Sequence, residues 1–298
     1  RNNRELTKNL YEIIKHMPKR SHPMDVARTA VSVMGLEDKE TSDSSQESNM
    51  RKALRIFAKT PTALAAFYRI RKGKKIIKPK KTLTFAENFF YMCFGKVPQK
   101  EIVKAFDVSL ILYAEHSFNV STFTARTITS SLSDIHGAIT GAIASLKGPL
   151  HGGANEEVMH MMNKIKKPEN ALKWINNALK NKDVVMGFGH RVYKSGDSRV
   201  PTMREYFGKV AKIKKDKKFE KIYDIVEKVM IKEKNIYPNV DYPTGPTYHL
   251  MGFDTDFFTP IFVISRITGW SAHIMEQHAA NKLIRPLAKY KGSKHRKV

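Results

Sequence analysis

Apolar residues recur at helical spacing along most of the 298-residue chain, and this pattern constrains the fold more than any other feature. No run alternates between apolar and polar residues convincingly enough to predict a sheet. Residues 156–165 and 216–234 each place their apolar side chains on one helix face, namely Val158, Met161, Met162 and Ile165 in the first segment and Ile222, Ile225, Val226, Val229 and Met230 in the second. The sequence therefore predicts a mainly α protein.

Two neighbouring stretches indicate how these helices pack. Residues 83–118 have apolar positions at helical spacing on both sides of a break at Gly95-Lys96-Val97-Pro98. Residues 121–146 are rich in Ala, Ser, Thr and Gly, with Ile and Leu between them. Because small side chains let helix axes approach closely, we expect buried helix-on-helix packing over 121–146.

The length and the hydrophobic content of 41% allow either one large domain or two unequal ones. Residues 166–218 are more charged than their surroundings, as a smaller and more exposed domain would be. Residues 37–51 are polar and predict a loop or a helix start, and residues 71–81 predict a basic loop.

The lone cysteine argues against a disulfide-linked protein, and the longest apolar stretch argues against a membrane-spanning one. Cys93 cannot form an internal disulfide, so we expect a buried thiol and a reducing, cytoplasmic setting. The stretch from Phe257 to Met275 contains Arg266 and His273, which predicts a buried helix and no membrane partner. The first residue is not Met, so an upstream targeting segment stays open.

The formal net charge of +25 is compatible with a polyanion-binding protein. Arg69 to Lys81 holds eight basic residues and no acid, and Lys209 to Lys218 holds six lysines and one acid. These runs are rich in Lys, whereas bidentate phosphate recognition favours Arg. A solvated surface is therefore favoured over a nucleic-acid site.

Four segments hold polar residues that a simple helical bundle does not need: 113–126, 148–156, 184–199 and 239–241. In the second segment, His151 lies among glycines before a helix whose first turn contains Glu156 and Glu157. A helix N-terminus disfavours a nearby imidazolium, so such a histidine can stay neutral and donate a hydrogen bond to a developing enolate. A plain capping role is the alternative for this residue taken alone.

The third and fourth segments offer a histidine preceded by glycines and a candidate base. Gly187 and Gly189 flank Phe188 directly before His190, and Lys194 and Arg199 follow at positions suited to negative charge. Asp241 is the best candidate for a general base, because a loop between Pro238 and Pro246 could hold its carboxylate rigidly. Taken singly, an Asp in a turn is more often a turn former.

A metal site is not expected, because the histidines lack a paired ligand spacing such as His-Glu-x-x-His. This holds for the histidines at 116, 136, 151, 160, 190, 249, 273 and 278.

Together these segments resemble the citrate synthase family. The resemblance runs from His22-Pro-Met-Asp-Val26 to Arg285-Pro286, with the histidine segments, the Asn239-Val240-Asp241 motif and two later arginines in the family's order and at closely similar spacing. It implies a two-domain helical fold, with a large domain at 1–152 and 256–298 and a smaller, mobile domain at 153–255. It also implies an acyltransferase that condenses acetyl-CoA with oxaloacetate and water to give citrate and CoA.

The resemblance implies three catalytic roles. Asp241 matches the base that removes the α-proton of the acyl thioester. His151 matches the histidine that hydrogen-bonds the thioester oxygen as the enol forms, and His190 matches the one that polarises the ketone of oxaloacetate.

It implies the substrate ligands in the same way. The residues that match oxaloacetate ligands are His116, Arg199, Arg266 and Arg285, and the last of these implies a homodimer because it matches an arginine that reaches the neighbouring site. The loop that matches the CoA adenine site comprises Val184, Val185, Met186, Gly187 and Phe188, while Lys194 and Asn239 match other CoA contacts. The acyl-CoA is a co-substrate, and no permanently bound cofactor is implied.

The identity of the acyl group stays open. Residues 242–252 and 140–155 look closer to 2-methylcitrate synthases, which accept propionyl-CoA. One methylene contributes only about 1–3 kcal/mol to discrimination, so a dual-specificity enzyme is a further alternative. Family members also usually carry an additional N-terminal segment, so we expect residues before Arg1. Polyanion binding remains a rival function, although it leaves the histidine segments unexplained.

Overall fold

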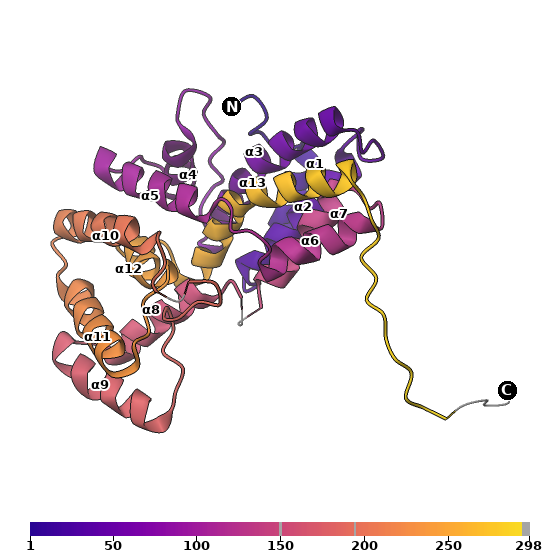
Figure 1. The fold of residues 1–298 in the computed structure, drawn as a ribbon. Helices are drawn as coiled ribbons and strands as arrows, with labels where there is room; N and C mark the ends of the chain where they lie inside the picture. Colours follow the sequence, from indigo (N-terminus) through magenta and orange to yellow (C-terminus); the bar gives the residue numbers. More distant parts are fainter. Residues whose placement is uncertain (149–150, 194, 294–298) are drawn as a thin grey trace.

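The computed structural model describes residues 1–148, 151–193 and 195–293, which fold into helices joined by loops (Figure 1). Within these ranges the only β pairing is an isolated bridge between Phe188 and Pro238, which confirms the mainly α prediction. The helices of the first part are α1 (Lys8–His16), α2 (Pro23–Glu37), α3 (Gln46–Arg71), α4 (Phe85–Phe94), α5 (Lys100–Tyr113), α6 (Val120–Ser130) and α7 (Ile135–Leu146). The remaining elements are α8 (Ala154–Ile165), α9 (Pro168–Asn181), α10 (Val200–Lys214), α11 (Lys218–Lys234), α12 (Asp241–Met251), the 3₁₀ turn η1 (Thr255–Phe257) and α13 (Phe258–Ala279).

The predicted break after the first aromatic segment is confirmed by the end of α4. Thr84 and Glu87 form a reciprocal capping box at its start, and Gly95 ends it with a φ of 79°. This left-handed conformation costs glycine little, so the chain turns there before α5 begins. Helix α3 begins at Gln46, within the polar segment 37–51 for which a loop or a helix start was predicted. It ends at Arg71, so residues 72–81 form the predicted basic loop.

Small residues bring α2, α6 and α7 together, as predicted for 121–146. A Cβ added to Gly35 of α2 would lie 2.9 Å from the Cβ of His136 in α7, closer than real Cβ atoms come. The buried residues of α7 include Ala138, Ile139, Ala142 and Ile143. The close approach therefore depends on the absence of side-chain atoms at these contacts.

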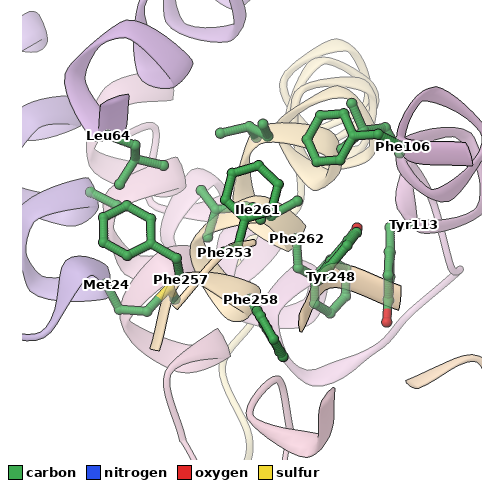
Figure 2. Packing of buried hydrophobic residues seen from close by; sticks show 14 of the residues in the cluster. Met24, Leu64, Phe106, Tyr113, Tyr248, Phe253, Phe257, Phe258, Ile261 and Phe262 are labelled. Atoms are coloured by element: carbon green, nitrogen blue, oxygen red, sulfur yellow. The ribbon is translucent and has the colours of Figure 1, made fainter. Parts of the chain in front are cut away.

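An aromatic cluster joins α3, α4, α5 and the α12–α13 connection (Figure 2). Phe253, which follows α12, lies at its centre, with ring centroids 5.0 Å from Phe94, 5.4 Å from Phe90 and 5.7 Å from Phe106. Aromatic pairs at such distances contribute beyond the area that they bury. The cluster therefore anchors the end of α12 to the helices of the first part.

Helices α9 to α12 lie together at the lower left of Figure 1. There α12 packs on both α8 and α10, and α11 packs on α9. Gly245 lets α12 touch the backbone of α8, because a Cβ there would lie 2.7 Å from the Asn155 carbonyl oxygen. This grouping resembles the smaller domain that the sequence indicates, whose boundaries at 153 and 255 stay a prediction.

The predicted loop from Pro238 to Pro246 is wrong, because α12 begins at Asp241 and includes both Pro243 and Pro246. Pro243 lies in the first turn, where backbone N–H groups have no intrahelical acceptor in any case. The hydroxyls of Thr244 and Thr247 donate to the carbonyl oxygens of Val240 and Pro243, at 2.7 and 2.6 Å. Asp241 is thus the first residue of a helix.

The C-terminal helix α13 is buried along most of its length, which confirms the prediction for Phe257 to Met275. None of the helices in the described ranges combines the length and the apolar character that crossing a membrane requires. Cys93 is buried and is not in a disulfide.

Candidate active site

The first turn of α6 fixes the tautomer of His151. The Ser121 N–H donates to His151 Nε2 at 3.1 Å, and the Ser121 hydroxyl lies 2.8 Å from the same nitrogen. Because a backbone N–H can only donate, Nε2 must accept, and the proton of a neutral ring must be on Nδ1. Trp270 Nε1 donates to the Ser121 hydroxyl at 3.1 Å and so holds it in place.

His151 is neutral at physiological pH, as predicted, but the cause differs. Burial lowers its pKa to about 4, and the positive charge of Arg266 adds to this effect. The sequence argument relied on the N-terminus of the following helix, α8, which begins three residues later. The dominant cause is therefore desolvation, with a cation from α13 contributing second.

His190 has the opposite tautomer. The N–H groups of Val192 and Tyr193 both point to its Nδ1, at 3.0 and 3.2 Å, so Nε2 is the nitrogen that can donate from a neutral ring. The flanking glycines have left-handed conformations, with φ of 83° at Gly187 and 77° at Gly189. The positive φ values set the path of the loop that leads to His190. Glycine is needed at both positions, because few other residues adopt this conformation without strain.

Asp241 at the start of α12 accepts a hydrogen bond of 2.5 Å from the hydroxyl of Tyr113, the last residue of α5. Burial raises the pKa of Asp241, while the Tyr113 hydroxyl and the Arg199 guanidinium oppose that rise. A carboxylate that is desolvated in this way is a stronger base than one in water.

Arg199 is held by Asp197, a residue that the sequence reasoning missed. Two parallel hydrogen bonds of 2.9 and 2.7 Å join its guanidinium to the carboxylate, which also accepts from the Val240 N–H at 3.0 Å. Although burial acts in the other direction, this pairing raises the pKa of Arg199 and keeps it charged. The guanidinium is therefore oriented beside the residue that precedes Asp241.

Arg266 is the common neighbour of the other groups. Its side chain is buried, its Nε donates to the Tyr113 carbonyl at 2.8 Å, and its guanidinium lies 4.6 Å from the Phe262 ring centroid. Burial lowers its pKa to about 10, with Arg199 contributing second, so it stays protonated at neutral pH. Its charge acts on the pKa values of His116, His151 and Asp241.

His116 lies against the ring of His190, at a centroid distance of 5.0 Å, and its Nε2 is 3.1 Å from the Tyr193 hydroxyl. Burial lowers its pKa to about 4, and Arg199 is the next cause. Two imidazoles and two guanidinium groups therefore surround one region, which suits a small anion with two carboxylates.

The loop 184–188 is held against α12. The Asn239 N–H donates to the Gly187 carbonyl at 2.8 Å, and the Asn239 side chain donates to the Gly189 carbonyl at 3.0 Å. A Cβ on Gly187 would lie 2.7 Å from a methyl group of Val158, so no side chain fits there. Val184 is exposed, Val185 is buried and Met186 and Phe188 are partly buried. Lys194 lies outside the described residues.

Arg285 is not part of this cluster. It is exposed on the extended segment after α13, which runs away from the rest of the chain in Figure 1, and its one hydrogen bond within the described residues is to the carbonyl of Pro286.

The described structure brings together most residues that the sequence singled out, namely His116, His151, His190, Arg199, Asp241 and Arg266. Sequence reasoning missed the roles of Tyr113, Ser121 and Asp197. Asp197 could have been found, because it lies two residues before Arg199 in a charged pair, whereas Tyr113 is 128 residues from Asp241. Clusters of three or more possible metal ligands do not occur in the described ranges.

The chain is similar to citrate synthases along most of its length. The family model for the C-terminal domain of citrate synthase matches residues 1–287. The citrate synthase of Mycolicibacterium smegmatis is 50% identical over 298 residues, covering 100% of this chain and 80% of the relative. The 2-methylcitrate synthase 2 of Corynebacterium glutamicum is 52% identical over 303 residues, covering 100% of this chain and 79% of the relative.

Solved structures show the same fold. Citrate synthase from Thermotoga maritima is 36% identical with a TM-score of 0.89, covering 100% of this chain and 79% of that one. Citrate synthase from Thermoplasma acidophilum, solved with carboxymethyl coenzyme A and oxaloacetate, is 33% identical with a TM-score of 0.91, covering 99% and 80%. The helical fold and the cluster of carboxylate, imidazole and guanidinium groups define an enzyme of acid–base chemistry on an anionic substrate. The chain belongs to the citrate synthase family.

Proposed function

We propose that this enzyme condenses acetyl-CoA with oxaloacetate and water to give citrate and free CoA. The observation that carries the proposal is the presence, in one cluster, of a partly buried carboxylate at Asp241 and a neutral His151 whose Nδ1 holds the proton. The α-proton of a thioester is weakly acidic. Its removal therefore needs a base and a preorganised donor at the carbonyl oxygen at the same time.

In the first step, Asp241 takes a proton from the α-carbon of the acyl group, and the electron pair moves toward the thioester oxygen. The Nδ1–H of His151 donates to that oxygen and stabilises the enol. The low pKa of His151 supports this role, because a neutral donor matches the weakly acidic enol better than an imidazolium does.

In the second step, the enol carbon attacks the ketone carbon of oxaloacetate, and the ketone oxygen takes a proton. His190 is the proposed donor, through Nε2, since backbone N–H groups occupy its Nδ1. The proposed carboxylate ligands are His116, Arg199 and Arg266. The citryl thioester then reacts with water, which breaks its C–S bond and releases CoA.

The CoA contacts are also part of the proposal. Residues 184–188 form the adenine loop, and Asn239 supports it through its hydrogen bonds to Gly187 and Gly189. The loop lies between α8 and the start of α12, next to the proposed base. We also propose the division into a large domain and a smaller mobile one, and a cytoplasmic location that the buried, unpaired Cys93 supports.

A second candidate substrate is propionyl-CoA, because relatives that are 50% and 52% identical are named 2-methylcitrate synthases. Discrimination by one methylene is limited to about 10- to 200-fold, so both substrates are expected to react. We predict a higher kcat/KM for acetyl-CoA when initial rates of thiol release are compared on one preparation. A higher value for propionyl-CoA would make 2-methylcitrate the main product.

Replacing the proposed base tests the mechanism. Asp241→Asn keeps the size of the side chain and removes its ability to accept the α-proton, so we predict a loss of about 10²- to 10⁴-fold in kcat. The measurement is CoA thiol release from acetyl-CoA and oxaloacetate. Asp254→Asn is the matched control, because that carboxylate pairs with Lys72 in a partly exposed ion pair outside the cluster. Wild-type turnover by Asp241→Asn would exclude this residue as the base.

The position of Arg285 supports a homodimer in which this arginine completes the neighbouring site, since it lies on an extended segment far from its own cluster. Co-expression of Asp241→Asn with Arg285→Gln separates the two arrangements. A mixed dimer then has one site with both wild-type residues, so random pairing restores about a quarter of wild-type activity. If Arg285 acts in its own subunit, mixing two inactive chains restores none.

A further inference from the structure

Tyr113 occupies a position that links the proposed base to the buried guanidinium. Its ring is buried at the end of α5 and packs on Phe262, with centroids 4.4 Å apart. Figure 2 shows it at the edge of the aromatic cluster, with its hydroxyl directed away from the centre. The hydroxyl donates to Oδ1 of Asp241, and the backbone carbonyl accepts from Nε of Arg266. A single residue thus contacts a carboxylate from α12 and a cation from α13.

The direction of the hydrogen bond follows from the chemistry of the two groups. Burial and the neighbouring Asp241 raise the pKa of Tyr113 well above its usual value, so the phenol stays protonated and donates. Within the described residues, Oδ1 accepts this bond at 2.5 Å, whereas no group donates to Oδ2. One oxygen of the carboxylate is therefore fixed, and the other is available for a proton.

The other charged groups around Asp241 come from three directions. Arg199 at the start of α10 and Arg266 in α13 favour the carboxylate, whereas Asp197 in the preceding loop disfavours it. Around Tyr113, the nearby polar groups are Tyr248 and Thr244 of α12. Among these neighbours, only Tyr113 donates a hydrogen bond to the carboxylate oxygens.

We propose that Tyr113 is a positioning residue for catalysis: its hydroxyl holds Oδ1 of Asp241 so that Oδ2 takes the α-proton of the acyl thioester. This inference rests on the proposed function of Asp241 and adds a residue to it. A fixed carboxylate reduces the reorganisation needed for proton abstraction, and small misplacements of a reacting group are costly in rate. The same hydrogen bond also stabilises the ionised form of the base.

Tyr113→Phe removes the hydroxyl and keeps the ring and the carbonyl. We predict that kcat/KM for acetyl-CoA falls by about 10- to 100-fold. The acidic limb of the pH–rate profile should move to higher pH, because the carboxylate loses a donor that favours its charged form. With trideuteroacetyl-CoA the isotope effect should increase, because proton abstraction becomes more rate-limiting. The KM for oxaloacetate should not change, because Arg266 binds the backbone carbonyl of residue 113, which the Phe variant keeps.

Tyr248→Phe is the matched control. Tyr248 is also buried in the aromatic cluster, and its hydroxyl lies 2.9 Å from the Ser109 hydroxyl with no hydrogen bond to Asp241. This variant removes a buried hydroxyl from the same cluster, so it should show the wild-type pH limb and isotope effect. The same shifts in both variants would mean a general packing effect and would overturn the proposal.

Site-specific replacement of Tyr113 by 3-fluorotyrosine keeps the proposal testable if Tyr113→Phe does not fold. The phenol is then a stronger donor, so the acidic limb should move to lower pH, opposite to the Phe variant. An unchanged limb in the fluorinated enzyme, or in a folded Tyr113→Phe, would overturn the role of Tyr113. Activity in Asp241→Asn would instead overturn the base assignment, so the two failures are distinguishable.

Discussion

The burial of the Arg266 guanidinium within α13 is the constraint on which the rest of the site depends. Only 2% of this residue is exposed, and no salt bridge to it occurs within the described residues. A buried charge without a partner is costly, and burial accordingly lowers its pKa to about 10. A bound dicarboxylate would supply the missing negative charge. In the proposed function, the fold keeps this cation where it would pair with an anionic substrate, in addition to its contacts with the Tyr113 carbonyl and the Phe262 ring.

The positive charge of Arg266 acts to lower the pKa of each acid–base group around it. It disfavours the protonated forms of His116 and His151, whose pKa values burial lowers to about 4, and it favours the charged form of Asp241. This charge therefore opposes the rise that burial causes in the pKa of Asp241, and it adds to the fall that burial causes in the pKa values of the two histidines. The aromatic cluster around Phe253 anchors the C-terminal end of α12, while the hydrogen bond from Tyr113 holds Asp241 at its other end.

The sequence predicted what local patterns determine and missed what depends on contacts between distant segments. Helical periodicity identified α4 to α8, and motif order singled out His151, His190, Asp241 and Arg266, whose catalytic and binding roles stay predictions. The prolines around Asp241 favoured a loop, but tertiary packing against α8 and α10 and the threonine hydroxyls of the first turns support a helix there. The partners Ser121 and Tyr113 carry no local signal, because their hydrogen bonds join residues 30 and 128 positions apart. The low pKa of His151 was predicted, but its cause required knowing the burial.

The central claim is that His151 is a neutral imidazole with its proton on Nδ1. Nitrogen-15 NMR of histidine-labelled enzyme tests it most directly, with the His151 signals assigned by their loss in a His151→Asn variant. We predict that His151 stays neutral from pH 8 down to about pH 5, with a protonated Nδ1 and an unprotonated Nε2. A His151 ring that titrates near 6.5, the usual value for a histidine side chain, or that carries its proton on Nε2, would contradict the account.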